Sequence, residues 1–353
     1  MSPTAAPPRK ARRNGAAAKR PAAARAGREK SPANGGKSTR ASQKAEPRAA
    51  GVKAAETALA PSPELAAMAA ALERYLGKAL LPGVSIPPTL HAAIRYSVLS
   101  PGKRLRPMLV LAACEAVGED WRRALPAAAA IECAHAFSLV HDDLPAMDDD
   151  DYRRGRLTTH KKYGEALGIL AGDALLAFAF EALTGLTDEG VSPERVVGAV
   201  GILAAACGST DLIGGQVLDL EAEGQRTGEA AVRAIHTRKT GGLMGASLAL
   251  GALVGGASAE RIEAFDEMGR DLGLAFQIHD DLLNRAGTLA RTGKRPGTDD
   301  TRGKATYPRA VGDERARGEA SRLFLGVLER IETLGPPASN LGLLVLAVAE
   351  RER

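Results

Sequence analysis

Residues 142–151 contain six aspartates, and three arginines follow within five positions. The aspartates are Asp142, Asp143, Asp148, Asp149, Asp150 and Asp151, and the arginines are Arg153, Arg154 and Arg156. Like charges at this density repel one another unless a cation lies among them. Carboxylates suit a hard cation such as Mg²⁺, which completes its shell with water and phosphate oxygens, and arginine forks bind phosphates. The stretch predicts a metal-bridged phosphate or diphosphate site; the alternative is a solvated acidic loop.

A second acidic pair, Asp280 and Asp281, interrupts an otherwise apolar segment. On a helix, Asn284 lies at i+4 from Asp280 and shares its face. Charge inside a buried helix is costly unless a cation compensates it. Two such pairs on separate helices, facing each other across a bundle core, would form a site for several metal ions.

The spacing of Asp142 and Asp148 does not suit a regular helix, because residues six apart point in different directions. Pro145 lies between them and removes a helical hydrogen bond. We therefore expect a bulge near residues 144–147 that returns Asp148 to the side of Asp142.

A basic motif, Gly-Lys-Arg-Leu-Arg-Pro at residues 102–107, follows Ser-Pro and opens a predicted helix. The partial positive charge of a helix N-terminus, together with three cationic side chains, favours anion binding. A solvated basic turn is the alternative. Gln216 and Asp219, at i and i+3, face either the same site or a structural hydrogen-bond network.

The chain has 353 residues, 45% of them hydrophobic, which allows a sizeable core. Cys114, Cys133 and Cys207 show no paired spacing, which indicates free thiols in a reducing compartment and hence a cytoplasmic protein. The uncharged run 240–259 is interrupted by glycines, so we expect a packed core helix and no integral membrane contact.

Residues 1–60 carry fourteen Lys or Arg and three Glu, whereas the rest of the chain has a net charge of −6. This Ala/Pro/Lys/Arg-rich segment has too few large apolar side chains to fold, and we predict a disordered tail. It is a solubilising extension, a nonspecific polyanion-binding arm or a targeting segment. An acidic body argues against a nucleic-acid-binding protein.

Residues 61–353 form the second predicted domain, and their apolar residues recur with helical spacing from Pro63 onward. No stretch shows sustained strand alternation, so the fold class is all-α, a helical bundle with its site in the core. The predicted helices after the first are about 88–99, 103–117, 122–141, 165–185, 193–208, 228–238, 240–254, 259–283, 306–333 and 339–352.

The two acidic stretches resemble the first and second aspartate-rich motifs of the trans-prenyltransferases, the polyprenyl diphosphate synthases. Asp-Asp-Leu-Pro-Ala-Met-Asp, two residues longer than Asp-Asp-x-x-Asp, is most similar to the bacterial farnesyl diphosphate synthase branch. The resemblance covers about residues 64–353. It implies the isoprenoid synthase fold, an active site in the central cavity and a homodimer.

The resemblance also implies a reaction, the Mg²⁺-dependent 1′-4 condensation of isopentenyl diphosphate with dimethylallyl or geranyl diphosphate, which releases diphosphate. Three Mg²⁺ ions are expected, on Asp142, Asp148 and Asp280. The other candidate catalytic residues are Asp143, Lys239 and Asp281.

Family positions also suggest how the two substrates are held. The residues expected to bind isopentenyl diphosphate are Lys103, Arg106, His135 and Arg154. The residues expected to bind the allylic diphosphate are Arg153, Lys239 and Lys294. Thr240 and Gln277 stand at family positions of the same site, and Lys304 belongs to a loop that closes over this diphosphate.

Product length follows from Phe137, which lies about 7.5 Å before Asp142 on a helix, and from its neighbour Ser138. In the family an aromatic residue here closes the pocket at fifteen carbons, so the expected product is farnesyl diphosphate. Geranylgeranyl or geranyl diphosphate is the alternative.

One departure from the family pattern is Asn284, which stands where the second motif usually has aspartate. Its amide brings no negative charge, which weakens the expected third metal site. A non-catalytic partner subunit is therefore a further alternative. A terpene cyclase would lack the 102–107 motif and carry a different second metal motif.

Overall fold

A computed structural model describes residues 62–80, 86–286 and 303–349. All of them belong to one compact unit that spans Ala55–Arg353. The predicted disordered tail and Lys294 lie outside the described residues, so what we infer for them stays a prediction.

The described chain is almost entirely helical, which confirms the all-α prediction. Its longer helices are α1 (Pro63–Ala79), α2 (Pro88–Val98), α3 (Leu105–Ala116), α4 (Leu125–Asp142), α6 (Glu165–Thr184), α7 (Pro193–Cys207), α8 (Leu212–Ala222), α9 (Glu229–His236), α10 (Gly242–Val254), α11 (Ala259–Ala286), α15 (Asp313–Glu332) and α16 (Ser339–Ala349). Short elements are η1 (Trp121–Ala124), α5 (Thr159–Tyr163), η2 (Gly185–Thr187), the π-helix η3 (Thr237–Gly241), α14 (Tyr307–Val311), η4 (Pro336–Ala338) and the strands β1 (Tyr152–Arg153) and β2 (Arg156–Leu157).

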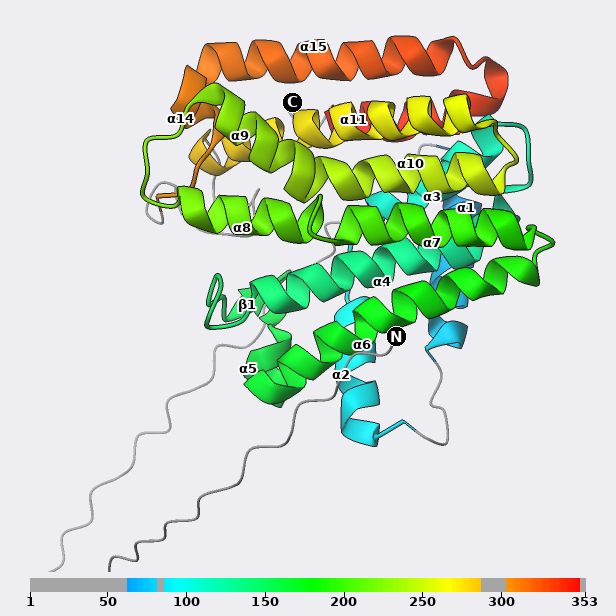
Figure 1. Ribbon diagram of the computed structural model, residues 1–353, viewed down its shortest axis with the longest axis horizontal. Helices are drawn as coiled ribbons and strands as arrows, with labels where there is room; N and C mark the ends of the chain where they lie inside the picture. Colours follow the sequence, from blue (N-terminus) through cyan, green and yellow to red (C-terminus); the bar gives the residue numbers. More distant parts are fainter. Residues whose placement is uncertain (1–61, 81–85, 287–302, 350–353) are drawn as a thin grey trace, which may run out of the picture. The chain divides into compact units, whose positions relative to one another are not determined.

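The helices stack in layers from α15 through α11 and α10 to α4 and α6 (Figure 1). Extensive contacts join α10 to α11 and α3, and α4 to α6. Every residue of α10 is buried, as are most residues of α4. These two helices therefore form the centre of the bundle. The N-terminal end of α10 and the C-terminal end of α4 reach the site described below.

Small residues allow α10 to lie this deep. A Cβ atom at Gly251 would come within 2.2 Å of the Val110 carbonyl oxygen on α3, a distance that no side chain tolerates. The glycines that interrupt residues 240–259 are therefore packing positions of a core helix, as the sequence predicts.

Several local features differ from the sequence prediction, among them the short helix α5 and the strands β1 and β2, which were not expected. Helix α8 was not expected, because its Gly-Gly pair weakens the helical signal. Gly312, with φ 88°, divides the predicted helix 306–333 into α14 and α15. Residues 237–241 form a π turn that joins α9 to α10 and carries Lys239.

By length and composition alone, the segments Trp121–Asp142, Glu165–Thr187 and Pro193–Ala222 could each cross a membrane. The first is 72% buried inside the protein, which identifies it as a core helix. The other two are 33% buried, so they present apolar surface outward.

Candidate active site

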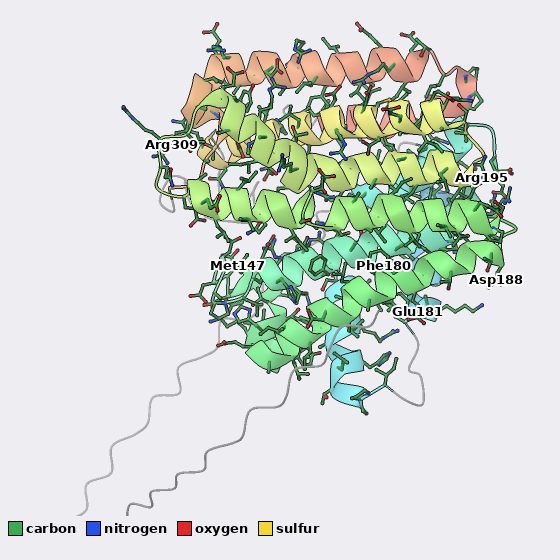
Figure 2. The ribbon with its side chains drawn as sticks, viewed as in Figure 1. Met147, Phe180, Glu181, Asp188, Arg195 and Arg309 are labelled. Carbon is green, nitrogen blue, oxygen red and sulfur yellow. The ribbon has the colours of Figure 1, made fainter. Side chains whose placement is uncertain are left out.

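The predicted site residues gather at one end of the bundle. Met147, in the turn after α4, and Arg309, in α14, lie at this end, whereas Asp188 and Arg195 lie at the opposite end (Figure 2). The first acidic motif and the C-terminal segment thus share a location despite their separation in sequence.

The turn that follows α4 brings Asp148 back to Asp142, as Pro145 predicts. The helix ends at Asp142, and the backbone N–H of Asp148 donates to the Asp142 carbonyl at 2.9 Å. A second bond, from the Asp149 N–H to the Leu144 carbonyl at 3.1 Å, closes the turn. Two carboxylates that a regular helix would separate are therefore neighbours.

Asp143 turns away from this pair and binds Arg153. Its carboxylate is 3% exposed and accepts from Arg153 Nε at 2.8 Å and from the terminal nitrogen of the same guanidinium at 2.6 Å. Burial opposes the charge of Arg153, but the bonds to Asp143 hold the pKa of the guanidinium above its ordinary value. Asp143 thus fixes the arginine that follows the motif.

The second acidic pair divides its roles in the same way. Asp280 is exposed, whereas Asp281 is 3% exposed. The Asp281 carboxylate accepts from the backbone N–H of Tyr307 at 2.8 Å and from Gln277 Nε2 at 3.1 Å, and it pairs with His236 Nε2 at 2.9 Å. Asp281 therefore ties α9, α11 and the start of α14 together.

Thr240 and Gln277 join this network. The Thr240 hydroxyl donates to Gln277 Oε1 at 2.9 Å, and the other end of the amide reaches Asp281. Thr240 and Gln277, which the sequence predicts for substrate binding, are thus hydrogen-bonded to each other and link the π turn to α11.

Asp219 on α8 connects Lys239 and Lys304. Its Oδ2 accepts from Lys239 Nζ at 2.7 Å and from Lys304 Nζ at 3.3 Å. Burial opposes the charge of Asp219, but these two cations hold its pKa below the ordinary value. The sequence left Asp219 between a site role and a structural role, and the structure gives it the lysines as partners.

Lys304 also reaches the first acidic motif. Its Nζ lies 3.3 Å from Asp148 and 2.7 Å from Glu223. Burial disfavours its charge, but the surrounding carboxylates hold the pKa of Lys304 above its ordinary value. Lys304 contacts Asp148 and the Tyr307 backbone contacts Asp281. The four residues 304–307, which span at most about 11 Å, therefore bridge the two acidic motifs.

The acidic residues suit a cation that a substrate helps to hold. Burial, and then the nearby charges of Asp148 and Asp143, raise the pKa of Asp142 against the opposing effect of Lys239 and Arg153. The two cations do not fully offset the burial of this carboxylate, and a divalent cation would add the positive charge that is needed. Among residues 62–80, 86–286 and 303–349, no three acidic, histidine or cysteine side chains converge as a complete metal cage. Mg²⁺ needs none, because it binds through one or two carboxylates plus water and phosphate.

A basic pocket forms between α3, α4 and the hairpin of β1 and β2. Arg106 Nη1 donates to His135 Nε2 at 3.4 Å. Burial lowers the pKa of Arg106 to about 10, which leaves it charged at neutral pH. Burial, and then the neighbouring arginines, hold the pKa of His135 well below its ordinary value. His135 is therefore neutral and accepts from Arg106.

The hairpin carries Arg154 into this pocket. Arg154 and Gly155 both have positive φ, 53° and 74°, as a two-residue hairpin turn requires. Arg154 Nη1 donates to the Pro101 carbonyl at 3.1 Å. A Cβ atom on Gly102 would lie 2.1 Å from that nitrogen, so glycine there makes room for the guanidinium. Lys103 is exposed beside it.

Phe137 lies buried on α4, one turn before His141. The two rings meet edge to face with centroids 5.3 Å apart. His141 in turn packs on α6, where a Cβ at Gly172 would lie 2.1 Å from the imidazole. Phe137 is thus supported from behind, and Ser138 bonds back to the His135 carbonyl.

Sequence reasoning missed Arg104, Glu132 and His236 as parts of the site. Glu132 is 4% exposed and pairs with Arg104, and His236 pairs with Asp281. Glu132 is the one acidic residue in the apolar stretch 125–140 of the sequence. A charge in a buried helix needs a partner, so this isolated acid was the signal that could have identified the pair.

An all-α bundle with two facing aspartate motifs and a ring of basic side chains defines the isoprenoid synthase fold. The family model "Polyprenyl synthetase" matches residues 87–332, and the chain belongs to this family.

Individual relatives agree with this assignment. A heterodimeric geranylgeranyl pyrophosphate synthase large subunit from Arabidopsis thaliana is 48% identical over 241 residues, which make up 67% of this chain and 65% of the relative. This chain therefore matches somewhat less than two thirds of that relative's length.

Solved structures agree as well. An FPP/GFPP synthase from Zymomonas mobilis has a TM-score of 0.71 at 34% identity and covers 80% of this chain and 96% of its own. A geranyltransferase from Helicobacter pylori, complexed with magnesium and isoprenyl diphosphate, has a TM-score of 0.72 at 31% identity and covers 82% and 98%.

Gly102→Ala is expected to displace the Arg154 guanidinium. If this pocket binds isopentenyl diphosphate, as the resemblance of the 102–107 motif implies, the displacement weakens that binding. Losing a charged hydrogen bond costs about 1.5–3 kcal/mol, so KM for isopentenyl diphosphate should rise about 10- to 100-fold. Steady-state kinetics measures it. Gly318→Ala, on the exposed face of α15 with open space around its added Cβ, serves as the control. An unchanged KM in Gly102→Ala would contradict the role of Arg154.

His135→Asn is expected to reduce the loss of stability in acid. Below about pH 6.5 the unfolded chain takes up a proton that native His135 cannot, so the free energy of unfolding falls by up to about 1.4 kcal/mol per pH unit. The variant lacks this linkage. Urea unfolding at pH 7 and pH 5 measures the difference, and equal losses in both proteins would refute it.

Proposed function

We propose that the protein is a prenyltransferase that condenses isopentenyl diphosphate with dimethylallyl and geranyl diphosphate and releases diphosphate. The observation that carries the proposal is the pairing of an acidic, lysine-bearing site with a separate arginine and histidine pocket, one for each diphosphate. The matched structure that holds magnesium and an isoprenyl diphosphate supports the choice of ligands.

The acidic half of the site serves the allylic diphosphate. Asp142, Asp148 and Asp280 would hold up to three Mg²⁺ ions, which neutralise the leaving diphosphate when bound. Lys239 and Lys304 then exchange their bonds to Asp219 for phosphate oxygens, and Arg153 stays fixed by Asp143. Preorganised cations of this kind stabilise charge that develops as the allylic C–O bond breaks.

The basic pocket holds the second substrate. Lys103, Arg106 and Arg154 supply charge, and neutral His135 adds a ring nitrogen without adding repulsion. Held in place, the double bond of isopentenyl diphosphate attacks the allylic carbocation, and proximity replaces a bimolecular encounter. The diphosphate that has just left is the base that takes the proton, so no side chain need act as one.

The proposed end product is farnesyl diphosphate. Phe137 supports this choice, because its ring is buried and is held from behind by His141 against α6. Geranylgeranyl diphosphate is the second candidate, because the relative from Arabidopsis bears that name. Buried free thiols at Cys114, Cys133 and Cys207 support a cytoplasmic location.

The experiment is a product analysis of the full chain with Mg²⁺, isopentenyl diphosphate and dimethylallyl diphosphate. Wild type should yield farnesol after dephosphorylation, and Phe137→Ala should yield longer alcohols because the pocket floor is removed. Phe324→Ala, which removes a buried ring on the outer helix α15, is the matched control.

The outcomes separate the parts of the proposal. Geranylgeraniol from wild type would keep the reaction and discard Phe137 as the floor. No condensation, or activity that survives removal of all divalent ions, would reject the proposed function itself.

We also propose a homodimer formed through the outer face of α6, α7 and α8. Helix α6 contacts α7, and α7 contacts α8. All three helices present exposed apolar side chains. The residues are Ile169, Leu170, Val197, Val200, Ile213, Val217 and Leu220. A contiguous apolar surface on adjacent helices is typical of a protein–protein interface.

Val197→Glu is expected to convert the dimer to a monomer, because it places a charge on this apolar face. Light scattering after size exclusion measures the mass. Leu325→Glu changes an exposed apolar residue on α15, 60% exposed against 71% for Val197, and should stay dimeric. A monomeric wild type, or a dimeric Val197→Glu, would reject this interface.

A further inference from the structure

Glu132 is a carboxylate in the buried stretch of α4, and its side chain is 5% exposed. It forms an ion pair with Nη1 of Arg104, whose side chain is 7% exposed. Arg104 Nε also donates to Glu73 on α1 at 2.7 Å. One guanidinium thus joins α1, α4 and the start of α3. Burial of such charges costs several kcal/mol per ion, so the arrangement calls for a reason beyond packing.

The backbone at Arg104 is also unusual. Arg104 has φ 49° and ψ 28° and precedes the first residue of α3. A non-glycine residue in this left-handed region costs about 1–3 kcal/mol and persists only where its surroundings determine it. The Arg104 carbonyl accepts from Met108 N–H at 3.0 Å, so the helix starts from this turn. Lys103 lies immediately before the turn and Arg106 two residues after it.

The charge of Glu132 acts on the whole pocket. Burial disfavours the charged guanidinium of Arg104, Arg106 and Arg154. The nearby carboxylate of Glu132 favours the charged form of all three. Arg154 also experiences repulsion from Arg104 and Arg153. Without a buried anion, three arginines at this density would separate.

We propose that Glu132 and Arg104 are a positioning pair that fixes the left-handed turn before α3. The turn holds Lys103 and Arg106 in register with Arg154 for the diphosphate of isopentenyl diphosphate. Neither member of the pair contacts the substrate. The inference rests on the proposed function and adds two residues to it.

Glu132→Gln distinguishes positioning from simple electrostatics by the sign of its effect. If Glu132 only offsets positive charge, its removal strengthens diphosphate binding and lowers KM for isopentenyl diphosphate. If it positions the turn, the arginines relax and this KM rises. We expect a rise of about tenfold, equivalent to ~1.4 kcal/mol, with KM for geranyl diphosphate within about twofold of wild type, because the acidic half of the site is untouched.

Arg104→Lys provides an independent variant. Lysine keeps the charge but cannot join two carboxylates with a planar fork, so it should raise the same KM selectively. In the double variant with Glu132→Gln, the effects should be less than additive, because both changes break one interaction. Full additivity, or an unchanged KM in either single variant, would overturn the pairing.

Asp271→Asn is the matched control, since Asp271 on α11 pairs with Arg330 on α15, away from the basic pocket. It should lower thermal stability without changing either KM. If Glu132→Gln behaves in the same way, its role is only structural and the proposal fails. Wild type is assayed first: absence of condensation there rejects the proposed function, whereas an active wild type with an unaffected Glu132→Gln rejects the positioning pair alone.

Discussion

Charge cannot be buried without compensation, and one end of this bundle is organised around that constraint. Asp142 is half-buried and Asp280 is exposed, while their neighbours Asp143 and Asp281 are buried and hydrogen-bonded. Asp143 binds Arg153, and Asp281 binds His236, Gln277 and the Tyr307 backbone. Each aspartate pair thus gives one carboxylate to the scaffold, and the proposed function assigns the other to Mg²⁺.

The same constraint explains how the bundle holds cations ready for a diphosphate. Lys239 and Lys304 share Asp219, and Lys304 also reaches Asp148 and Glu223. These lysines are held near their place of action by carboxylates that a negatively charged substrate can replace. The arginines of the basic pocket also lie near a carboxylate, because Glu132 is their buried counter-ion. The two halves of the site are therefore preorganised by separate sets of anions.

Much of this was accessible from the sequence, because the informative signals were local. The acidic pairs, the 102–107 motif and the helical periodicity each lie within one short stretch, and Pro145 between Asp142 and Asp148 predicted the turn that reunites them. The sequence could not show which aspartate of a pair faces inward, since that depends on partners far along the chain. His236 and Asp281, for example, are 45 residues apart. The π turn at Thr237–Gly241 and the buried pair of Glu132 and Arg104 likewise arise from tertiary packing.

The π turn at Thr237–Gly241 lets the direction of Lys239 and the packing of α10 be set independently, whereas a continuous α-helix would couple them. In a continuous α-helix each residue advances by about 100°, so the direction of Lys239 would be dictated by the buried face of α10. One wider turn resets the angular phase between α9 and α10. The lysine can then point to Asp219 while α10 keeps its glycines against α3 and α11. The core can thus be optimised for packing density, and the lysine for chemistry, each with its own helical phase.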